Sequence, residues 1–88
     1  VRRANAIIII TAIPYRTMWK YGQRGYRFVL MECGHVGQSL YLLGGALGLG
    51  AVSIGGFYDD ALARLMRLER DEHPLYLVCL GRVPAATA

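Results

Sequence analysis

Hydrophobic residues fall into runs with two different periods along the chain, and these runs predict alternating strands and helices. A continuous β-branched run at residues 5–13 (NAIIIITAI) ends at a proline and predicts a strand that is buried on both faces. Between residues 26 and 47, apolar side chains recur with helical spacing, and Gly48 suits the end of such a helix. Short apolar runs at 51–54 and 75–81 predict two further strands.

The remaining segments are interpreted from their turn residues and polar residues. Residues 15–25 mix basic and aromatic side chains with glycines and predict a connector. Gly55-Gly56 predicts a turn, after which Asp59 is expected to cap a second helix. The predicted order is β-α-β-α-β, an α+β fold (α/β layered) without an internal repeat, followed by a tail at 84–88. The inner face of the second helix is predicted to consist of Leu62, Leu65 and Met66.

The predicted long helix is unusually rich in glycine, at positions 34, 37, 44 and 45. Each glycine weakens a helix by up to about 1 kcal/mol relative to alanine, so close packing against another backbone is the simplest compensation. The uncharged stretch 36–58 is long enough to cross a bilayer. Its many glycines and its lack of aromatic and basic flanks argue against a membrane span. A buried helix followed by a buried strand is the better interpretation.

Composition adds that the chain is too apolar for its size. Of 88 residues, 55% are hydrophobic, whereas a domain this small buries only a modest core. The excess predicts burial against the rest of a domain or against a partner subunit. The first residue is Val1, close to a strand-like run, and this start favours a fragment of a longer protein.

Charge is unevenly distributed along the chain. Residues 1–31 carry six cations and no acid, whereas residues 32–88 carry four arginines and six acids. A basic N-terminal third fits an anionic partner such as a phosphate-bearing cofactor or nucleic acid, although a solvated basic loop explains the charge more simply. Cys33 and Cys79 lack metal or redox spacing and are predicted to be buried thiols in a reducing compartment.

Three segments contain residues suited to chemistry. Lys20-Tyr21, near Gly22, is a candidate proton-transfer pair, because neighbouring cations and partial burial lower the pKa of a lysine. His35 is a lone helical histidine without metal-ligand partners, and such a residue is more often a core or interface residue. The glycines of 48–57 suit either a tight turn or close approach of a flat or phosphorylated ligand to the backbone.

Taken together, these segments resemble a known family. The resemblance is carried by KYGQRGYRFVLMECGHVGQSLYLLGGALGLGAVSIGGFYDDAL and, further on, by PLYLVCLGR. They are similar to the C-terminal part of SagB-type dehydrogenases, which belong to the nitroreductase superfamily and include the azoline oxidases that form thiazoles and oxazoles in ribosomal peptides. The resemblance implies that residues 1–88 are the C-terminal portion of a nitroreductase-like FMN-binding domain.

The resemblance also implies roles for individual residues. A Lys-Tyr pair is catalytic in azoline-oxidising members, so Lys20 is expected to act as general base beside the ring nitrogen, with Tyr21 assisting and a hydride passing to flavin N5. The turn Ile54-Gly55-Gly56 is expected to lie over the isoalloxazine, with a backbone N–H facing N5. Arg82 is expected to hold the FMN phosphate. The long helix is expected to form the homodimer core, which would account for its four glycines.

Two features depart from the family pattern. Gln38-Ser39 stands where the family usually has Gln-Asn, and the arginine-rich phosphate motif that opens the family domain would precede Val1. The expected function is that of an FMN-dependent oxidoreductase in the cytoplasm, acting on an azoline-type peptide or a small molecule. The expected partner is a second copy or the missing N-terminal half.

Two alternatives remain. The chain is an incomplete remnant or split subunit that dimerises through the long helix, or it is a small nucleic-acid-binding domain that uses the basic and aromatic residues of 15–27. The family resemblance explains the same residues, so neither nucleic acid, nor a membrane, nor a metal is expected.

Overall fold

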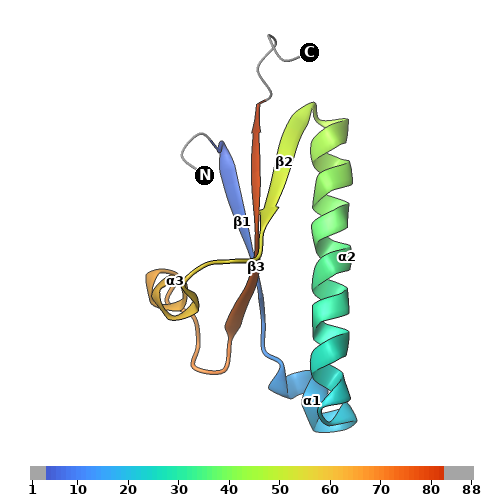
Figure 1. The fold of residues 1–88 in the computed structure, drawn as a ribbon, viewed down its shortest axis with the longest axis vertical. Coiled ribbons are helices and arrows are strands. Elements are labelled where there is room, and N and C mark those ends of the chain that lie inside the picture. Colours follow the sequence, from blue (N-terminus) through green and yellow to red (C-terminus); the bar gives the residue numbers. More distant parts are fainter. Residues whose placement is uncertain (1–3, 83–88) are drawn as a thin grey trace.

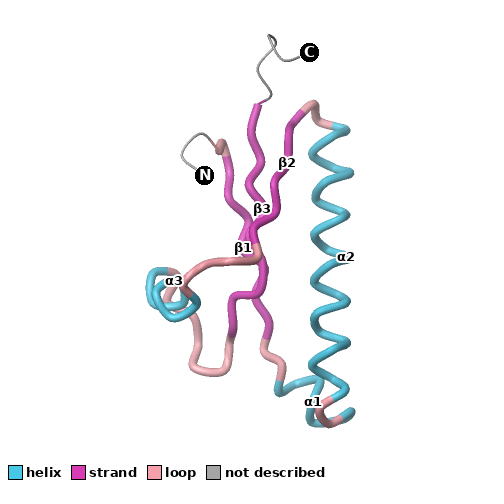
Figure 2. The backbone as a smooth tube through the Cα atoms, in the orientation of Figure 1, coloured by secondary structure: helices cyan, strands magenta, loops and turns pink. Residues whose placement is uncertain are grey.

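The computed structural model describes residues 4–82, so the predicted tail at 84–88 lies outside the described residues. One sheet lies between α2 on one side and α3 on the other (Figures 1 and 2). The α+β layered class is confirmed, with one more helix than predicted. The elements in chain order are β1 (Ala6–Ala12), α1 (Tyr15–Tyr21), α2 (Arg24–Ala46), β2 (Leu49–Ile54), α3 (Asp59–Leu65) and β3 (His73–Arg82).

The last strand of the chain lies at the centre of the sheet. The strand order is β1-β3-β2, and β3 pairs antiparallel with both neighbours. In this register Cys79 stands opposite Ile7 on one side and Val52 on the other. The pairing with β1 shifts between Ile10 and Thr11, which marks a β-bulge.

The predicted burial of the first strand on both faces is wrong for this chain. β1 is an edge strand, none of its residues is fully buried, and Ile7 is 44% exposed. Burial on both faces requires a layer on each side of the sheet. The described residues supply such a layer over β1 only in part.

The predicted connector at 15–25 is also wrong, because most of it is the helix α1. No residue of α1 is buried, so it has no apolar stripe by which its helical period could be recognised. The helix ends at Gly22, which has a φ of +65°. Gly25 then lets α2 cross α1 closely, since a Cβ there would lie 2.9 Å from the Cα of Met18.

The long helix is confirmed, with bounds two residues earlier at its start and one earlier at its end. Its buried residues include Cys33, Gly37 and Gly44, which lie on one stripe. A Cβ at Gly37 would lie 3.0 Å from Cε2 of Tyr76, and one at Gly44 would lie 3.1 Å from Cδ2 of Leu80. Both glycines therefore allow α2 to approach β3 of the same chain. Dimerisation is not needed to account for these two, contrary to the sequence prediction.

The third helix differs from its prediction in its start and in its inner face. Tyr58, not Asp59, occupies the N-cap, and no side chain caps the helix. Leu62 is half-buried as predicted, whereas Leu65 and Met66 are exposed. An aspartate in the first turn still interacts favourably with the helix dipole without capping.

A left-handed residue terminates α3. Arg67 has a φ of +54°. Its N–H bonds the carbonyl of Arg64 at 3.1 Å, and the N–H of Leu68 bonds the carbonyl of Ala63 at 3.0 Å. These two bonds form a Schellman motif, in which glycine is the usual left-handed residue. Arginine at this position keeps the motif at a conformational cost.

The hydrophobic core within this chain is small. Apart from Pro14 and Pro74, its buried apolar side chains are those of Cys33, Val78 and Cys79 among the described residues. The accessible surface is 6983 Å² for 9.7 kDa, against about 5,100 Å² for a compact monomer of this mass. The radius of gyration is 14.9 Å, against about 12 Å for a compact domain of this length. Within residues 4–82, no helix combines the length and the apolar character that crossing a membrane requires.

Candidate functional site

The predicted flavin-facing turn lies where β2 leaves the sheet. Ile54 is the last residue of β2 and pairs with Leu77, and the two glycines that follow are exposed. A Cβ on Gly55 would lie 3.9 Å from the ring of Tyr76, an ordinary contact, and one on Gly56 would meet nothing within 4 Å. Neither glycine has a left-handed φ. Neither the backbone nor the packing of the described residues therefore requires glycine here.

A hydroxyl from α2 fixes the strand just before this turn. The hydroxyl of Tyr41 donates to Oγ of Ser53 at 3.0 Å and accepts from the N–H of Ser53 at 2.9 Å. β2 is an edge strand, so a backbone N–H on its outer side has no strand partner. Tyr41 occupies that position and ties the end of β2 to the long helix.

An aromatic ring lies between the long helix and the turn. The ring of Tyr76 lies beside Gly37 on α2 and reaches to Gly55 on its other edge. A rigid ring on the central strand thus sets the spacing between the long helix and the turn. Tyr41 and Tyr76 were not singled out from the sequence. In the sequence, Tyr41 falls within the predicted long helix and Tyr76 within the predicted last strand, and neither pattern indicates a role at the turn.

The predicted catalytic pair lies at the end of α1. Lys20 is exposed, and its Nζ lies 5.4 Å from the ring centroid of Tyr21. The Tyr21 ring packs edge-on against Phe28, with centroids 5.1 Å apart. Phe28 thereby fixes Tyr21 against α2, while Lys20 stays in solvent. The described residues do not supply the partial burial that the sequence prediction requires for Lys20.

Arg82, the predicted phosphate ligand, lies at the far end of β3, opposite Leu49. Its side chain is exposed, and its backbone N–H donates to Oδ1 of Asn5 at 3.0 Å. The N–H of Asn5 in turn bonds the carbonyl of Leu80 at 2.8 Å. Asn5 therefore fixes the end of β3 from which Arg82 projects, a role with no signal in the sequence.

The described chain does not bring the three predicted segments together. Ile54, at the start of the turn, pairs with Leu77 of β3. Leu77 and Arg82 are five residues apart on that strand, or about 17 Å at a strand rise of about 3.4 Å. The helix α1, which contains Lys20, lies beyond the opposite end of the sheet, next to the start of α2 (Figure 1). The turn and Arg82 are thus spaced along one strand, whereas Lys20 belongs to α1, at the other end of the sheet from the end of β3 (Figure 1).

Comparison with known proteins decides the family. A model of the nitroreductase family matches residues 1–82. The chain belongs to the nitroreductase family. A protein of Methanocaldococcus jannaschii that is named as a nitroreductase is 46% identical over 79 residues, which are 90% of this chain and 39% of that protein.

Solved structures support the same assignment. A nitroreductase-named protein of Anabaena variabilis superposes with a TM-score of 0.84 at 38% identity, over 92% of this chain and 17% of that one. A chain of the Escherichia coli microcin synthetase McbBCD complex, with truncated pro-MccB17 bound, superposes with a TM-score of 0.84 at 32% identity. The match covers 89% of this chain and 30% of that one. A nitroreductase-named protein of Ralstonia eutropha superposes with a TM-score of 0.81 at 26% identity, over 90% of this chain and 38% of that one. This nitroreductase-family chain thus spans about two fifths or less of these relatives.

Nitroreductase-family proteins generally use a flavin, and the turn of this chain fits one. The exposed backbone at Gly55 and Gly56 offers a surface without side chains, which a flat ring can approach closely. Arg82 supplies a cation suited to a phosphate on the same strand system. Gly55, Gly56 and Arg82 are therefore the described residues that would hold the ring and the phosphate of such a cofactor.

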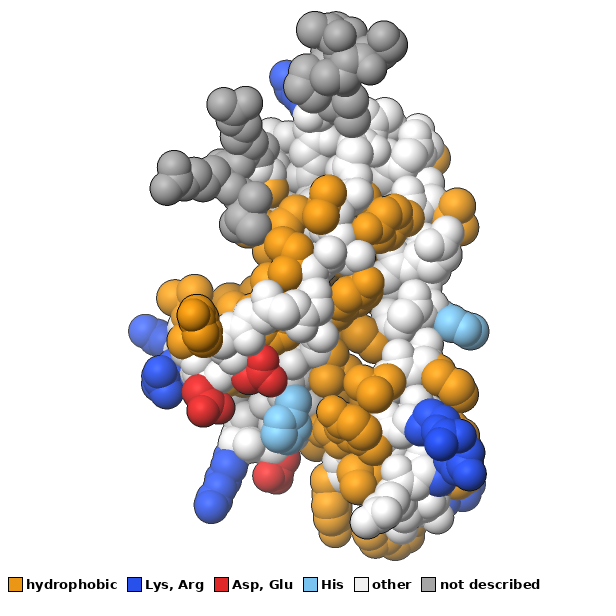
Figure 3. All heavy atoms as spheres, viewed as in Figure 1, with side chains coloured by type: hydrophobic (Ala, Val, Ile, Leu, Met, Phe, Trp, Pro, Cys, Tyr) orange, Lys and Arg blue, Asp and Glu red, His pale blue; other side chains and the backbone are white. Residues whose placement is uncertain are grey.

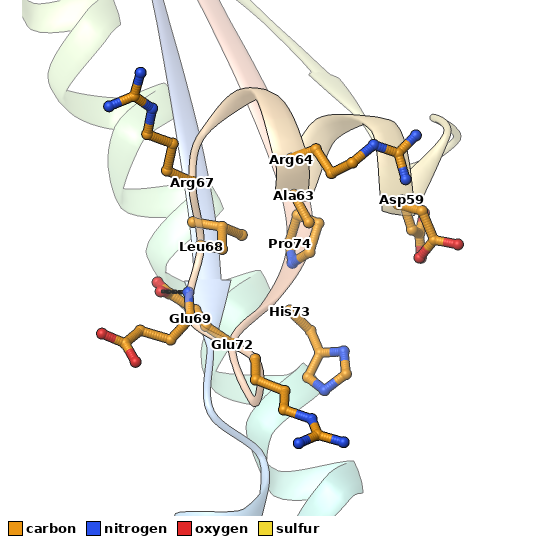
Figure 4. A pocket seen from close by; sticks show the side chains of 11 residues that line it. Asp59, Ala63, Arg64, Arg67, Leu68, Glu69, Glu72, His73 and Pro74 are labelled. Atoms are coloured by element: carbon orange, nitrogen blue, oxygen red, sulfur yellow. Dashed lines mark hydrogen bonds between the residues drawn. The ribbon is translucent and has the colours of Figure 1, made fainter.

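A separate groove of about 340 Å³ lies between α3 and the start of β3 in this nitroreductase-family chain (Figure 4). Acidic and basic side chains both line it, and those of Arg64 and Arg67 point in different directions. Within the groove, the backbone N–H of Glu69 donates a hydrogen bond to the carboxylate of Glu72 at 3.4 Å (Figure 4). The groove contains none of the predicted site residues.

The two thiols are free and buried, as predicted. Cys33 lies on the face of α2 that covers the sheet, and burial raises the pKa of its thiol above the ordinary value of 9.0. His35 is exposed on α2. Neither these thiols nor this imidazole lies in the turn at Gly55-Gly56.

Proposed function

We propose that this chain supplies the flavin-ring side of the active site of an FMN-dependent oxidoreductase of the SagB type. The observation that carries the proposal is the open glycine turn after β2. Gly55 and Gly56 leave a bare backbone surface that the fold of the chain itself does not require. Close approach of a flat ligand explains the absence of side chains there.

FMN, when bound, accepts or donates a hydride. The chain's own contribution is to position and to move a proton. The Tyr76 ring lies next to Gly55 of the turn, and the Tyr41 hydroxyl bonds Ser53 just before it, so both residues fix the position of the turn. Arg82 binds the phosphate as a charged donor. Lys20 removes a proton from the substrate and Tyr21 orients it, once a second polypeptide covers the exposed end of α1.

The proposed substrate is an azoline-type ring in a peptide, or a small molecule of similar shape. Support comes from Lys20-Tyr21 and from the similarity to a chain of a microcin synthetase complex. Substitution of Lys20 by arginine keeps the positive charge but removes an amine that can give up its proton. We expect Lys20→Arg to lower turnover of a thiazoline peptide by about 100-fold or more with FMN binding intact.

A split subunit that dimerises through α2 is the second candidate function. A Cβ at Gly34 or Gly45 on the outer side of α2 would meet nothing within 4 Å, and Leu42 is 66% exposed. Small residues and exposed leucine on one helix face suit packing against a second copy. Light scattering on the chain tests for the homodimer, and flavin binding is then measured with the rest of the domain present. A homodimer that fails to bind flavin under these conditions supports only the second candidate.

The proposed function is tested at the turn. Gly55→Val places a branched side chain on the exposed surface, and the chain itself has room for the first carbon. We expect FMN affinity of the assembled domain to fall by at least about tenfold. Leu65→Ala on the exposed side of α3 is the control and leaves affinity unchanged. Equal affinities for Gly55→Val and wild type would remove the turn from the flavin site.

A further inference from the structure

Three cations and an exposed ring gather where α1 meets α2. Lys20 lies in the last turn of α1, and Arg24 and Arg27 lie in the first turn of α2. All three side chains are exposed, as is that of Trp19 beside Lys20. Figure 3 shows Lys and Arg side chains gathered over the first turns of α2. These four residues are called here the basic corner.

The acids of the chain lie away from the basic corner. None occurs in residues 1–31. Glu32, the next acid along the chain, lines a hollow between α2 and β1. The other five acids lie on α3 or between α3 and β3, and α3 is on the other side of the sheet from α2 (Figure 1). Two of them, Glu69 and Asp71, line a hollow with Arg16 at the start of α1 rather than with the basic corner.

The placement of these cations opposes the stability of α2. Its first turn contains Arg24 and Arg27 and no acid. The first turn of a helix carries partial positive charge, so cations are unfavourable there. Two arginines three positions apart are also neighbours on the helix surface and repel each other. Local rules of this kind are broken mainly at functional sites, and an anion held at the corner relieves both repulsions.

The side chains of the corner suit a carboxylate on a peptide. Arginine binds carboxylates through paired hydrogen bonds, and tryptophan and arginine are enriched where peptides and proteins bind tightly. Trp19 is 76% exposed. A nucleic-acid strand instead needs a row of open rings for successive bases, and the Tyr21 ring next to Trp19 is packed against Phe28. We propose that the basic corner binds an acidic segment of the peptide substrate, beside the ring on which Lys20 acts.

This inference rests on the proposed function for the reacting ring, whereas the preference for carboxylates rests on the charges of the corner. Arg24 follows Lys20 by four residues, which span about 6 Å as a helix and about 13 Å when extended. A bound extended peptide advances about 3.3 Å per residue. An acid about two to four positions from the reacting ring therefore reaches Arg24.

The test uses the chain and a dye-labelled peptide of alternating glutamate and glycine. Fluorescence anisotropy measures affinity, and the emission of Trp19, the single tryptophan of the chain, reports binding at the corner. We expect saturable binding that weakens as NaCl is raised. Arg24→Glu combined with Arg27→Glu should weaken binding by at least about tenfold and should create binding of the matching lysine peptide. Acids suit the first turn of a helix, so this double variant should unfold at or above the wild-type urea midpoint.

Arg64→Glu is the matched control, because it makes the same charge change at an exposed arginine of α3. It should leave the affinity within about twofold of wild type. Four results would overturn the inference: equal binding of a glutamine peptide, unchanged affinity in the double variant, constant Trp19 emission at saturation, or tighter binding of an oligothymidylate. The last result would make the corner a nucleic-acid surface.

Flavin and turnover separate this inference from the proposed function. If the corner binds the glutamate peptide, but the chain with the complementary part of the Methanocaldococcus relative binds no FMN, the inference stands and the proposed function fails. If that assembly binds FMN and oxidises thiazoline peptides with a KM independent of flanking glutamates, the proposed function stands and the inference fails. Where both hold, KM should be lowest with a glutamate about two to four positions from the thiazoline, with little change in kcat.

Discussion

Glycines of α2 that look alike in the sequence have opposite structural roles, and alanine substitution should separate them. A Cβ at Gly37 would lie 3.0 Å and 3.3 Å from two ring carbons of Tyr76, whereas a Cβ at Gly34 would meet nothing within 4 Å. We therefore predict that Gly34→Ala stabilises the chain and that Gly37→Ala destabilises it, although both substitutions improve helix propensity equally.

The magnitudes follow from two opposing terms. Alanine is favoured over glycine in a helix by up to about 1 kcal/mol, so Gly34→Ala should gain that amount. At Gly37 the same gain is opposed by overpacking of about 1–3 kcal/mol. A ring attached to the central strand yields less readily than the end of a flexible side chain, so overpacking should win. The two variants should differ by about 2 kcal/mol, or roughly 10 °C in Tm for a domain of this size.

Urea unfolding followed by far-ultraviolet circular dichroism measures the difference. Both variants should unfold with the slope of the wild type, so that the midpoints report stability alone. Gly44→Ala serves as a second test site, because its Cβ would lie 3.1 Å from Leu80. If Gly37→Ala is as stable as Gly34→Ala, the ring of Tyr76 does not limit the approach of α2, and the account of the support beneath the turn is wrong.

Three further predictions concern α3, the end of β2 and the thiol on α2. Arg67→Gly should stabilise the chain by about 1 kcal/mol in the same urea assay, because it relieves a left-handed φ of +54°; an unchanged midpoint would contradict the strain. Tyr41→Phe should cost about 1 kcal/mol by losing its hydroxyl bonds to Ser53, with Tyr58→Phe on an exposed tyrosine as the control. Because burial raises the pKa of Cys33, the native state gains stability below the unfolded pKa and loses it as pH rises through the folded value. Stability should therefore fall more steeply above about pH 9 in wild type than in Cys33→Ala, and identical slopes would refute the assignment.

The strands and the long helix could be predicted because their apolar periods are strong. β3 was recognised from residues 75–81, and α2 from its stripe of apolar residues, within two residues of the observed bounds. Element ends were less accurate, because they depend on single bonds. Asp59 has the right chemistry for an N-cap, yet Tyr58 occupies that position without a side-chain bond.

The failures arise where tertiary contacts decide the local structure. α1 has no buried residue, so no apolar pattern distinguishes it from a loop. The sequence treated four glycines of α2 as one set, but Gly37 and Gly44 pack against strands of the same chain. Such contacts join residues far apart in sequence, as the ring of Tyr76 does between Gly37 and Gly55.

The candidate site was predictable only in its family-like segments. The open turn at Gly55-Gly56 and Arg82 on the same sheet are the segments that the proposed flavin site uses. The exposure of Lys20 could not be predicted, because it depends on how α1 packs against the rest of the fold. The supporting residues Asn5, Tyr41 and Tyr76 act through bonds and contacts across the fold.

The most direct test of the central claim is flavin binding by this chain together with the part of the domain that it does not span. Purified chain and the complementary part of the Methanocaldococcus relative are mixed with FMN, and the shift of the visible flavin absorption is recorded. We predict a saturable shift that is lost in Gly55→Val and kept in Leu65→Ala. A shift unaffected by Gly55→Val, or no shift from a complex that has formed, would contradict it.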